Sequence, residues 1–300
     1  MNIIILSKGP GNYSTKRLKQ EAIDRGHDVR VVNYAQCYIS VEQDNPKVRY
    51  EGEDVSLVDV VIPRIASSYT MYGSSIVRQF EMMGAYTTTK SIALVRARDK
   101  LRSLQILAKA GVGIPKTVFS RETPEIEDIL EQVGGTPVII KIARGTHGKG
   151  VVLAETRKAA KAVMQAFYVE GVNFLVQEYI SESSGTDIRA FVVGNQVVAS
   201  MKRQSLDDDF RSNLHQGAEG SSIKLTEPEK KTALKAAKAM GLQVCGVDIV
   251  RSNRGPLVLE VNASPGFGIE RVTGRNISGK IIDYIERNAK QRNRKDRIGA

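Results

Sequence analysis

Two apolar segments near the C-terminal end of the chain, residues 246–251 and 257–262, carry three oxygen-bearing side chains: Asp248, Glu260 and Asn262. Glu260 and Asn262 are two residues apart, so on a strand both side chains leave the same face. An Asn-Arg-Gly turn between the segments lets the strand with Asp248 fold back beside them. Such oxygens suit Mg²⁺, which also keeps water and substrate phosphates as ligands. The pattern predicts a magnesium and phosphate site; the alternative is an ordinary hairpin with one polar face.

The composition is typical of a globular protein. The chain has 300 residues, 41% of them hydrophobic, enough for two or three lobes. No run approaches the roughly 18 apolar residues that a membrane span needs, and residues 1–7 show no basic segment ahead of their short apolar stretch. We therefore expect a cytoplasmic protein in which Cys37 and Cys245 are reduced thiols.

The net charge of +11 favours binding to polyanions but does not choose among nucleic acid, ribosomes, anionic lipid and acidic peptides. From Arg287 to Arg297 the tail holds six basic residues against Asp296, which gives 6 − 1 = +5 of that total. We interpret the tail as a solvated, frayed helix end; the alternative is a ribosome or RNA contact.

The first 90 residues alternate short apolar runs with helical patterns. The runs at 3–6, 29–32 and 58–62 are predicted strands, and the patterns at 17–25 and 76–83 are predicted helices. This βαβ order indicates a parallel sheet. Lys8-Gly-Pro-Gly11, after the first run, is interpreted as a turn and helix N-cap because it lacks the full glycine spacing of a dinucleotide loop.

The remaining chain predicts two α+β lobes. Strands are expected at 137–143, 151–154 and 174–180, then a hairpin at 188–193 and 196–201, a polar loop at 207–222, and a helix that begins at the capping box of Thr226 and Glu229. We expect four parts: an N-terminal α/β domain (1–97), a central lobe (98–180), a C-terminal lobe (181–287) and a basic tail (288–300).

Phosphate-binding features occur in the central lobe. Lys141 lies in an otherwise apolar strand and precedes the glycine loop 144–150, whose backbone N–H groups suit phosphate oxygens. This is not a Walker loop, because Lys149 is followed by Gly150 instead of Ser or Thr. The alternative for Lys141 is an ordinary lysine on an edge strand.

Three further positions are candidates for nucleotide contacts. Glu178 closes an apolar strand at a lobe junction, where it could meet an adenine or a ribose. Asp187 begins the next strand, and a strand-start cap is the alternative. Arg211, in the polar loop, could stabilise charge on a transferred phosphoryl group. Zinc and a serine nucleophile are not expected, because the chain has no Cys/His cluster and no Gly-x-Ser-x-Gly elbow.

Taken in order, these features resemble the ATP-grasp ligase pattern. The residues that carry it are Lys141, the glycine loop, 177–180, 187–189, 211–213, 246–248 and 259–265. The segments 63–65, 78–82, 96–102, 152–156 and 210–215 also resemble the RimK family of α-L-glutamate ligases. The resemblance runs from the first strand to about Arg287 and leaves out the 36–56 segment and the tail.

The resemblance implies an ATP-grasp fold, α/β and α+β, in which a pre-ATP-grasp domain precedes two lobes that clamp ATP. Lys141 and Arg211 are the implied catalytic residues. The implied ATP-binding residues are Lys141, Gly145, His147, Gly148, Lys149, Gly150, Glu178, Tyr179, Asp187, Arg211, Ser212 and Asn213, with Glu178 and Tyr179 at the adenine and Asp187 near the ribose. Asp248, Glu260 and Asn262 would hold two Mg²⁺ or Mn²⁺ ions, with Glu260 bridging them.

The resemblance also implies a reaction. A peptide's terminal carboxylate takes the γ-phosphoryl group of ATP, and the amine of free L-glutamate attacks the acyl phosphate, while the enzyme positions the reactants and screens charge. The implied acceptor is the C-terminal glutamate of a small-subunit ribosomal protein with an acidic tail, extended once or repeatedly, so that poly-α-glutamate is a further product. The family also suggests a homo-oligomer, a tetramer.

Substrate carboxylates need cationic partners, and guanidinium groups pair with them bidentately. The candidates are Arg64, Arg78, Arg189, Lys202 and Arg203, with surface solvation as the alternative for each. Two other functions stay open: an ATP-grasp ligase for another acid and amine, such as an amino-acid carrier protein, a pterin cofactor or a short peptide, and a non-catalytic ribosome or RNA binder. The second has less support, because a binder would have no need of Lys141, Arg211 and the three metal ligands.

Overall fold

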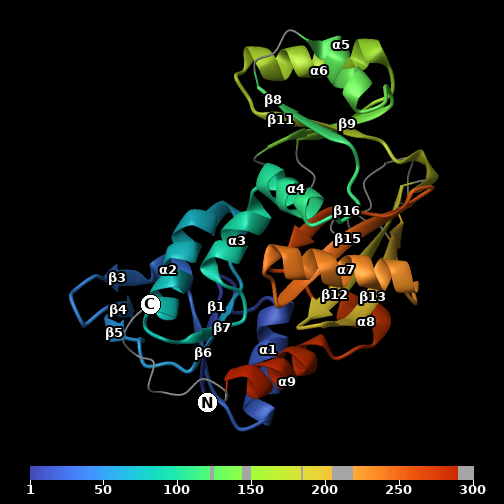
Figure 1. Cartoon of the computed structure of the whole chain (residues 1–300). Helices are drawn as coiled ribbons and strands as arrows, with labels where there is room; N and C mark the ends of the chain where they lie inside the picture. The colour runs from blue at the N-terminus through green and yellow to red at the C-terminus, as the bar shows by residue number, and fades with distance from the viewer. Residues whose placement is uncertain (122–124, 144–149, 184, 205–218, 290–300) are drawn as a thin grey trace.

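The computed structural model describes residues 1–121, 125–143, 150–183, 185–204 and 219–289 (Figure 1). These residues form four β-sheets and the helices that cover them. In Figure 1 the central lobe, with β8 to β11, lies above the other two parts of the molecule, and α4 lies at the junction.

A parallel sheet forms the centre of the N-terminal domain, as predicted. Its strand order is β2-β1-β6-β7. The elements are β1 (Asn2–Leu6), α1 (Tyr13–Asp24), β2 (Asp28–Val32), β6 (Val60–Pro63), α2 (Thr70–Met82) and β7 (Tyr86–Thr87). Arg64 continues the pairing, because its N–H donates to the Leu6 carbonyl at 2.9 Å.

The alternation of side chains along β1 places α1 and α2 on opposite faces of this sheet. Ile3 and Ile5 belong to the core that contains Leu18 of α1. Ile4 and Leu6 belong to the core that contains Phe80 of α2. Because successive strand side chains point to opposite faces, one fully apolar strand can support a helix on each side.

The 36–56 segment, which sequence analysis left without elements, forms a small antiparallel sheet. Its strands are β3 (Tyr38–Ser40), β4 (Lys47–Tyr50) and β5 (Glu53–Asp54), preceded by the 3₁₀ turn η1 (Tyr34–Gln36). A second 3₁₀ turn, η2 (Ser67–Tyr69), leads into α2. Strands this short, with polar and exposed residues, carry little periodicity for a sequence-based prediction to detect.

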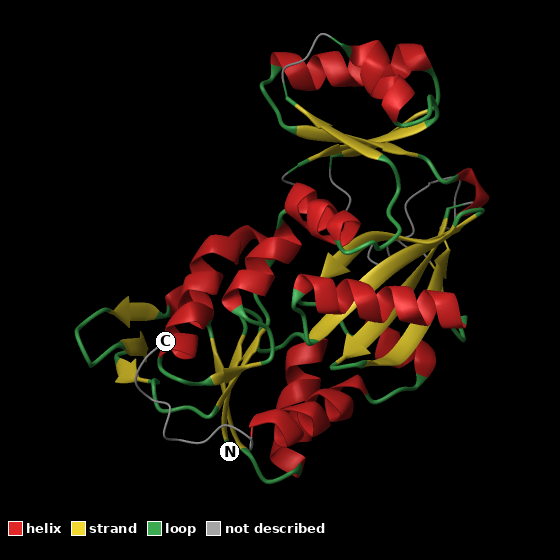
Figure 2. Ribbon diagram, viewed as in Figure 1, coloured by secondary structure: helices red, strands yellow, loops and turns green. Residues whose placement is uncertain are grey.

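The central lobe is a four-stranded antiparallel sheet with two helices on one face (Figure 2). The strand order is β10-β9-β11-β8. The elements are β8 (Thr117–Ser120), α5 (Ile126–Gln132), β9 (Val138–Ile142), β10 (Val151–Ala154), α6 (Arg157–Val169) and β11 (Phe174–Glu178), connected to the N-terminal domain by α3 (Ser91–Arg98) and α4 (Lys100–Lys109). The predicted strands of this lobe are confirmed.

A five-stranded antiparallel sheet of order β14-β13-β12-β15-β16 forms the C-terminal lobe. Its elements are η3 (Ser181–Ser183), β12 (Thr186–Val193), β13 (Gln196–Gln204), β14 (Glu219–Ser222), α7 (Glu227–Met240), β15 (Val244–Ser252), β16 (Gly255–Asn262), α8 (Gly268–Thr273) and α9 (Ile277–Ala289). The prediction of a polar loop over 207–222 was wrong at its end, because 219–222 pair with β13 as a strand. Residues 205–218 lie outside the described part.

The start of α7 confirms the predicted capping box. The Thr226 hydroxyl accepts from the Glu229 N–H, and the Glu229 carboxylate accepts from the Thr226 N–H at 2.8 Å. At the other end, Gly241 has φ 70°, the left-handed conformation that glycine adopts without strain. Sequence signals therefore fix both ends of this helix.

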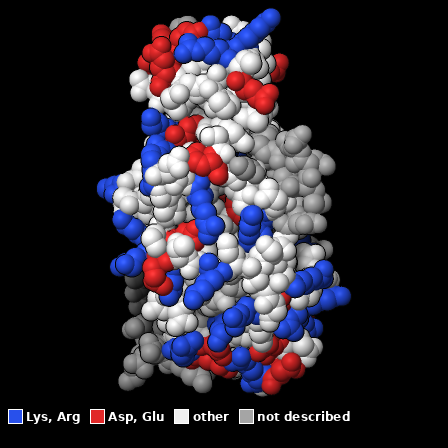
Figure 3. Space-filling view, turned by 90° about the vertical axis from the view of Figure 1, so that its right-hand side faces the viewer, with Lys and Arg blue, Asp and Glu red and all other residues white. Residues whose placement is uncertain are grey.

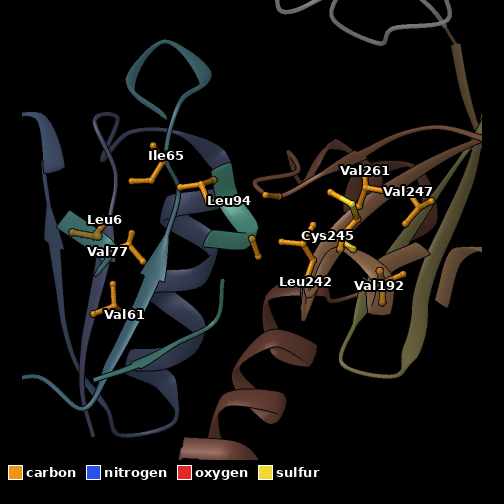
Figure 4. Close-up of a cluster of buried hydrophobic side chains, with 14 of the residues drawn as sticks. Leu6, Val61, Ile65, Val77, Leu94, Val192, Leu242, Cys245, Val247 and Val261 are labelled. Carbon is orange, nitrogen blue, oxygen red and sulfur yellow. The ribbon is translucent and has the colours of Figure 1, made fainter. Parts of the chain in front are cut away.

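One hydrophobic core joins the N-terminal domain to the C-terminal lobe (Figure 4). It includes Leu6 and Leu94 from the first part and Leu242, Val247 and Val261 from the second, all 2% exposed or less. The central lobe has a separate core, formed by residues between 129 and 176. Shared packing therefore fixes the N-terminal domain against the sheet that carries the predicted metal ligands.

Candidate active site

The hairpin of β15 and β16 brings the three predicted metal ligands together. Asp248 and Glu260 lie directly across from each other in the strand register. The Asn262 amide Nδ2 lies 2.9 Å from Glu260 Oε1 and 3.4 Å from Asp248 Oδ2. The predicted hairpin and the common face of the three side chains are thus confirmed.

The three ligands differ in burial. Asp248 is 2% exposed, whereas Glu260 is exposed. Asp248 accepts hydrogen bonds from both Nε and Nη2 of Arg189, the first at 2.7 Å, and it forms an ion pair of 3.0 Å with Arg203 Nη2. Burial alone would raise the pKa of Asp248, but the two guanidinium groups outweigh burial and hold that pKa well below its usual range. Asp248 is therefore a carboxylate at every physiological pH.

Arg203 joins Asp248 to Asp187. Its side chain is 2% exposed, and its Nε and Nη2 donate to the two carboxylate oxygens of Asp187, the first at 2.6 Å. Burial would lower the pKa of Arg203, but the two carboxylates outweigh burial and raise that pKa above its usual range. Arg189 and Arg203, which the sequence offers as partners for substrate carboxylates, are here paired with the protein's own carboxylates. Asp187, offered as a ribose contact, is paired as well.

Lys141 lies on β9, and its ammonium group faces the same region. Lys141 Nζ donates to Gln177 Oε1 of β11 at 2.7 Å. The pKa of Lys141 is lowered to about 8, chiefly by burial; the charge of Glu260 opposes this shift, and the charge of Lys100 adds to it. Lys141 is thus a partly desolvated cation near Glu260, a suitable partner for an anion.

Lys100 and Arg98 are two site residues that the sequence analysis did not select. Lys100 Nζ donates to the Ile142 carbonyl at 2.9 Å, and Arg98 Nη2 donates to the Ile65 carbonyl at 2.8 Å. Burial lowers the pKa of each, while the charge of Glu260 raises both. A signal was present in the sequence: Asp99 caps α4, so Arg98 ends α3 and Lys100 begins α4 on either side of the break between the two helices.

Glu178 and Gly150 lie at the edges of the central lobe. Glu178 Oε1 accepts from the Lys116 N–H at 2.6 Å and pairs with Arg254 of the β15–β16 turn, so its carboxylate ties two lobes together. Gly150 has φ 71°, and a Cβ there would lie 2.4 Å from the Ile142 side chain. The Gly150 carbonyl accepts a hydrogen bond from the Ile142 N–H, so the glycine loop ends at this residue. Tyr179 follows β11 and is half-buried.

Several predicted residues lie outside the described part of the chain: Gly145, His147, Gly148, Lys149, Arg211, Ser212 and Asn213. Among the candidates for substrate carboxylates, Arg64 is half-buried and donates to Ser14 and Pro265. Arg78 is exposed on α2 and donates to Ser75 of the same helix. Lys202 is half-buried on β13. Within the described part of the chain, the side chains of Arg64, Arg78 and Lys202 form no hydrogen bond or ion pair with the other predicted site residues.

The donor set fits a hard divalent cation. Asp248, Glu260 and Asn262 offer oxygens from one face of a hairpin, and the exposed Glu260 leaves room for water or phosphate. Within the described ranges, no group of three or more His, Cys, Asp or Glu side chains could hold a metal ion. The third ligand here is an amide, which suits magnesium and does not suit zinc.

The molecular surface carries charges of both signs. On the face that Figure 3 shows, Lys and Arg side chains are scattered over the part below the central lobe, with Asp and Glu among them. Within the described residues, no helix combines the length and the apolar character that crossing a membrane requires.

The sheets and the hairpin site define an ATP-grasp protein. A solved structure of the ATP-grasp ligase PsnB, in complex with a minimal precursor, Mg and ADP, superposes with a TM-score of 0.75 and 19% identity; the match covers 97% of this chain and 98% of that chain. Two family models match in succession: the RimK PreATP-grasp domain over residues 1–94 and the RimK-like ATP-grasp domain over residues 97–285. The chain therefore belongs to the RimK-like ATP-grasp family.

Curated relatives agree over the whole length. A probable alpha-L-glutamate ligase from a Picosynechococcus strain is 54% identical over 299 residues, and a protein of the same description from a Vibrio cholerae O1 strain is 52% identical over 298 residues; each match covers 99% of both chains. The predicted family and fold are confirmed. The protein is an ATP-dependent ligase that forms carbon–nitrogen bonds.

Proposed function

We propose that the protein adds L-glutamate to the C-terminal glutamate of a peptide. The observation that carries this proposal is the identity above 50%, over 99% of the chain, to proteins described as probable alpha-L-glutamate ligases. Magnesium and nucleotide use is supported by the neighbouring ligase PsnB, which has been solved with Mg and ADP and with AMPPNP. The donor set of the hairpin agrees with it.

In this proposal ATP lies between the central and C-terminal lobes. Lys141 and Lys100 face the phosphates, because each is a partly buried cation in the field of Glu260. Tyr179 and the backbone near Glu178 border the adenine, Asp187 lies near the ribose, and the glycine loop up to Gly150 covers the phosphates. The remaining nucleotide contacts come from His147, Lys149 and the segment of Arg211, Ser212 and Asn213.

The metal would be held by Asp248, Glu260 and Asn262, as two Mg²⁺ or Mn²⁺ ions bridged by Glu260. Its chemistry is to neutralise phosphate charge and to orient the γ-phosphoryl group. Arg189 and Arg203 keep Asp248 ionised and fix its direction, so the ligand is in place before any substrate arrives. This is preorganisation by the protein's own ion pairs.

The reaction then runs in two steps. A carboxylate oxygen of the peptide attacks the γ-phosphorus, which gives an acyl phosphate and ADP. The amine of glutamate attacks the acyl carbon, and phosphate leaves with the former carboxylate oxygen as the amide bond forms. Lys141 and Arg211 stabilise the charge that develops on the transferred phosphoryl group.

The natural acceptor in this proposal is a small-subunit ribosomal protein with an acidic C-terminal tail, extended by one or more glutamates in the cytoplasm. A basic protein suits such an acceptor, because opposite charge speeds encounter. A homotetramer is the proposed assembly. The proposed division of the chain stays at 1–97, 98–180, 181–287 and 288–300.

The test is an amino-acid panel. The protein is mixed with ATP, Mg²⁺, a peptide that ends in glutamate and one amino acid at a time; phosphate release and product mass are measured. The proposal predicts release with L-glutamate and products longer by glutamate units. Turnover with a different amino acid would point to another acid and amine pair. Absence of turnover with every amino acid, by a folded protein, would contradict the proposal.

A further inference from the structure

The strand order of the N-terminal domain places a topological switch point between β1 and β6, where open parallel sheets form a crevice at the carboxyl ends of the strands. From β1 the chain passes through α1 to β2 on one side, and from β6 it passes through α2 to β7 on the other side. Because the two connections leave in opposite directions and cover opposite faces, the carboxyl ends of β1 and β6 border a topological switch point. Open parallel sheets bind ligands at this place.

Cationic side chains gather at this crevice. Lys8 follows β1, Arg64 follows β6, and Arg98 ends α3 beside the same loop, where its Nη2 donates to the Ile65 carbonyl at 2.8 Å. Lys8 Nζ donates to the Tyr69 hydroxyl at 3.0 Å and lies 4.2 Å from the centre of that ring. The three cations come from separate segments, so the fold, and not one basic run of sequence, assembles them.

The two arginines have neutral partners. Arg64 Nη2 donates to the Ser14 hydroxyl at 3.0 Å and to the Pro265 carbonyl at 2.7 Å, and its guanidinium lies over the Phe267 ring. Arg98 Nε is a buried donor without any hydrogen-bond partner in the described structure. Within the same described ranges, neither arginine forms an ion pair, whereas Arg189 has one and Arg203 has two. A guanidinium held in this way lacks the anion that a desolvated charge requires.

The two arginines also repel each other. Burial lowers the pKa of Arg64, and the nearby charge of Arg98 lowers it further. Lys100 and Lys141 form a second repelling pair. The charge of Glu260 raises the pKa of Arg98, as it raises the pKa of each of those lysines. This one carboxylate therefore acts on one member of the arginine pair and on both lysines. An anion bound at each pair would relieve its repulsion, and the lysine pair already suits the phosphates of ATP.

The position of the arginine pair is fixed by packing. Ile65 next to Arg64, Leu94 one turn before Arg98, and Ala263 after Asn262 are all members of the core that joins the two parts of the molecule. Neither arginine is fully buried as a residue, because both are of intermediate exposure. At the same crevice α1 begins without a side-chain cap from Asn12 and without an acidic residue in its first turn, which leaves its dipole free to favour an anion. The helix N-cap predicted after Gly11 is Asn12, but its side chain forms no capping hydrogen bond.

We propose that the crevice between β1 and β6 binds a carboxylate of the amino acid that supplies the amine, through Arg64 and Arg98, with Lys8 at its mouth. This inference rests on the proposed function. It places one substrate carboxylate on the N-terminal domain, beside the metal ligands and apart from the lysine pair. The bidentate geometry of guanidinium suits a carboxylate that does not react.

The test uses Arg64→Gln, Arg98→Gln and Lys8→Gln, with Lys19→Gln as the control, an exposed lysine of α1 in the same domain. For the two arginine variants we expect KM for glutamate to rise about tenfold to a hundredfold, as for a lost charged hydrogen bond, and KM for ATP to change less than twofold. Lys8→Gln, at an exposed position that does not endanger the fold, should show a smaller rise in the same direction. Thermal unfolding followed by circular dichroism identifies a variant that does not fold.

A change in the substrate sharpens the test. Glutamate α-amide lacks the α-carboxylate, and glutamine lacks the side-chain carboxylate. One of these two compounds therefore lacks the carboxylate that the crevice binds, and for that compound wild type and Arg98→Gln should have the same KM. A rise in KM for ATP or for the peptide alone, or unchanged constants in all three variants, would overturn the inference while the ligase activity stands. If wild type ligates no amino acid, the proposed function fails instead. In that case the binding of glutamate and of succinate is measured by calorimetry, with the protein loaded with Mg²⁺ and AMPPNP. Binding to wild type that the arginine variants lose supports a carboxylate site at the crevice. No binding to wild type, or equal affinity in wild type and the variants, overturns it.

Discussion

Two substitutions at the metal ligands should separate catalysis from stability. Asp248→Asn and Glu260→Gln each replace a carboxylate by an amide of the same shape. Both remove a proposed ligand for the metal, and with it several kcal/mol of charge stabilisation, so phosphate release should fall by about a hundredfold or more in both. Their effects on folding should differ, because Asp248 is 2% exposed and Glu260 is exposed.

The magnitude follows from the partners of each residue. Asp248 neutralises two guanidinium groups, with Arg189 Nε at 2.7 Å and Arg203 Nη2 at 3.0 Å. Asp248→Asn leaves both arginines beside a single remaining carboxylate, Asp187. Breaking a buried ion pair by removing one partner costs about 3–5 kcal/mol of the free energy of unfolding. Glu260→Gln disturbs the hydrogen bond from Asn262 and removes a charge that acts on Arg98, Lys100 and Lys141. Because Glu260 is exposed, solvent screens that charge, and a loss of about 1–2 kcal/mol is expected.

The assay is urea unfolding without metal or nucleotide, followed by circular dichroism, because the chain has no tryptophan. Midpoints are converted to free energies of unfolding with the m-values measured for each variant. The expected order is wild type, then Glu260→Gln close to it, then Asp248→Asn well below. Equal stability of the two variants, or Asp248→Asn within 1 kcal/mol of wild type, would refute the assigned role of the arginine network.

Three further outcomes are expected. Since the pKa of Lys141 is about 8, its positive charge is present below that pH and lost above it. ATP affinity measured by calorimetry should therefore fall by about tenfold to a hundredfold as the pH rises through 8 to 10. Lys141→Arg should give a nearly flat profile, and a flat wild-type profile would contradict this prediction. Thr226→Ala removes the capping box of α7 and should lower the free energy of unfolding by about 1 kcal/mol with kcat unchanged, which a loss of activity in the folded variant would contradict. Cys37 and Cys245 are 2% and 0% exposed, and burial raises the pKa of both thiols, so a disulfide reagent should modify neither until the protein unfolds; rapid reaction of the native protein would show that one is accessible.

The sequence predicts the hairpin site well because the signal is local. Strand alternation places Glu260 and Asn262 on one face, and the Asn-Arg-Gly turn sets the register that brings Asp248 opposite Glu260. The same holds for the βαβ units of the N-terminal domain and for the capping box at Thr226. Each of these features depends on residues a few positions apart.

Other features depend on contacts between distant segments and could not be predicted in this way. Chemically identical arginine side chains take different roles: Arg203 is buried between two carboxylates, whereas the one hydrogen bond of the Arg98 side chain to a described residue goes to a backbone carbonyl. Burial and partner decide between these roles, and both follow from tertiary packing. The edge strand β14 was also missed, because Glu219–Ser222 is short and polar and becomes a strand by pairing with β13.

The central claim is that a peptide carboxylate is activated by transfer of the γ-phosphoryl group. The most direct measurement supplies a peptide whose terminal carboxylate carries ¹⁸O, together with ATP, Mg²⁺ and glutamate, and follows the mass of the released phosphate. An acyl phosphate predicts that one ¹⁸O atom appears in each phosphate and the other stays in the new amide. Unlabelled phosphate, or release of AMP and pyrophosphate, would contradict the mechanism.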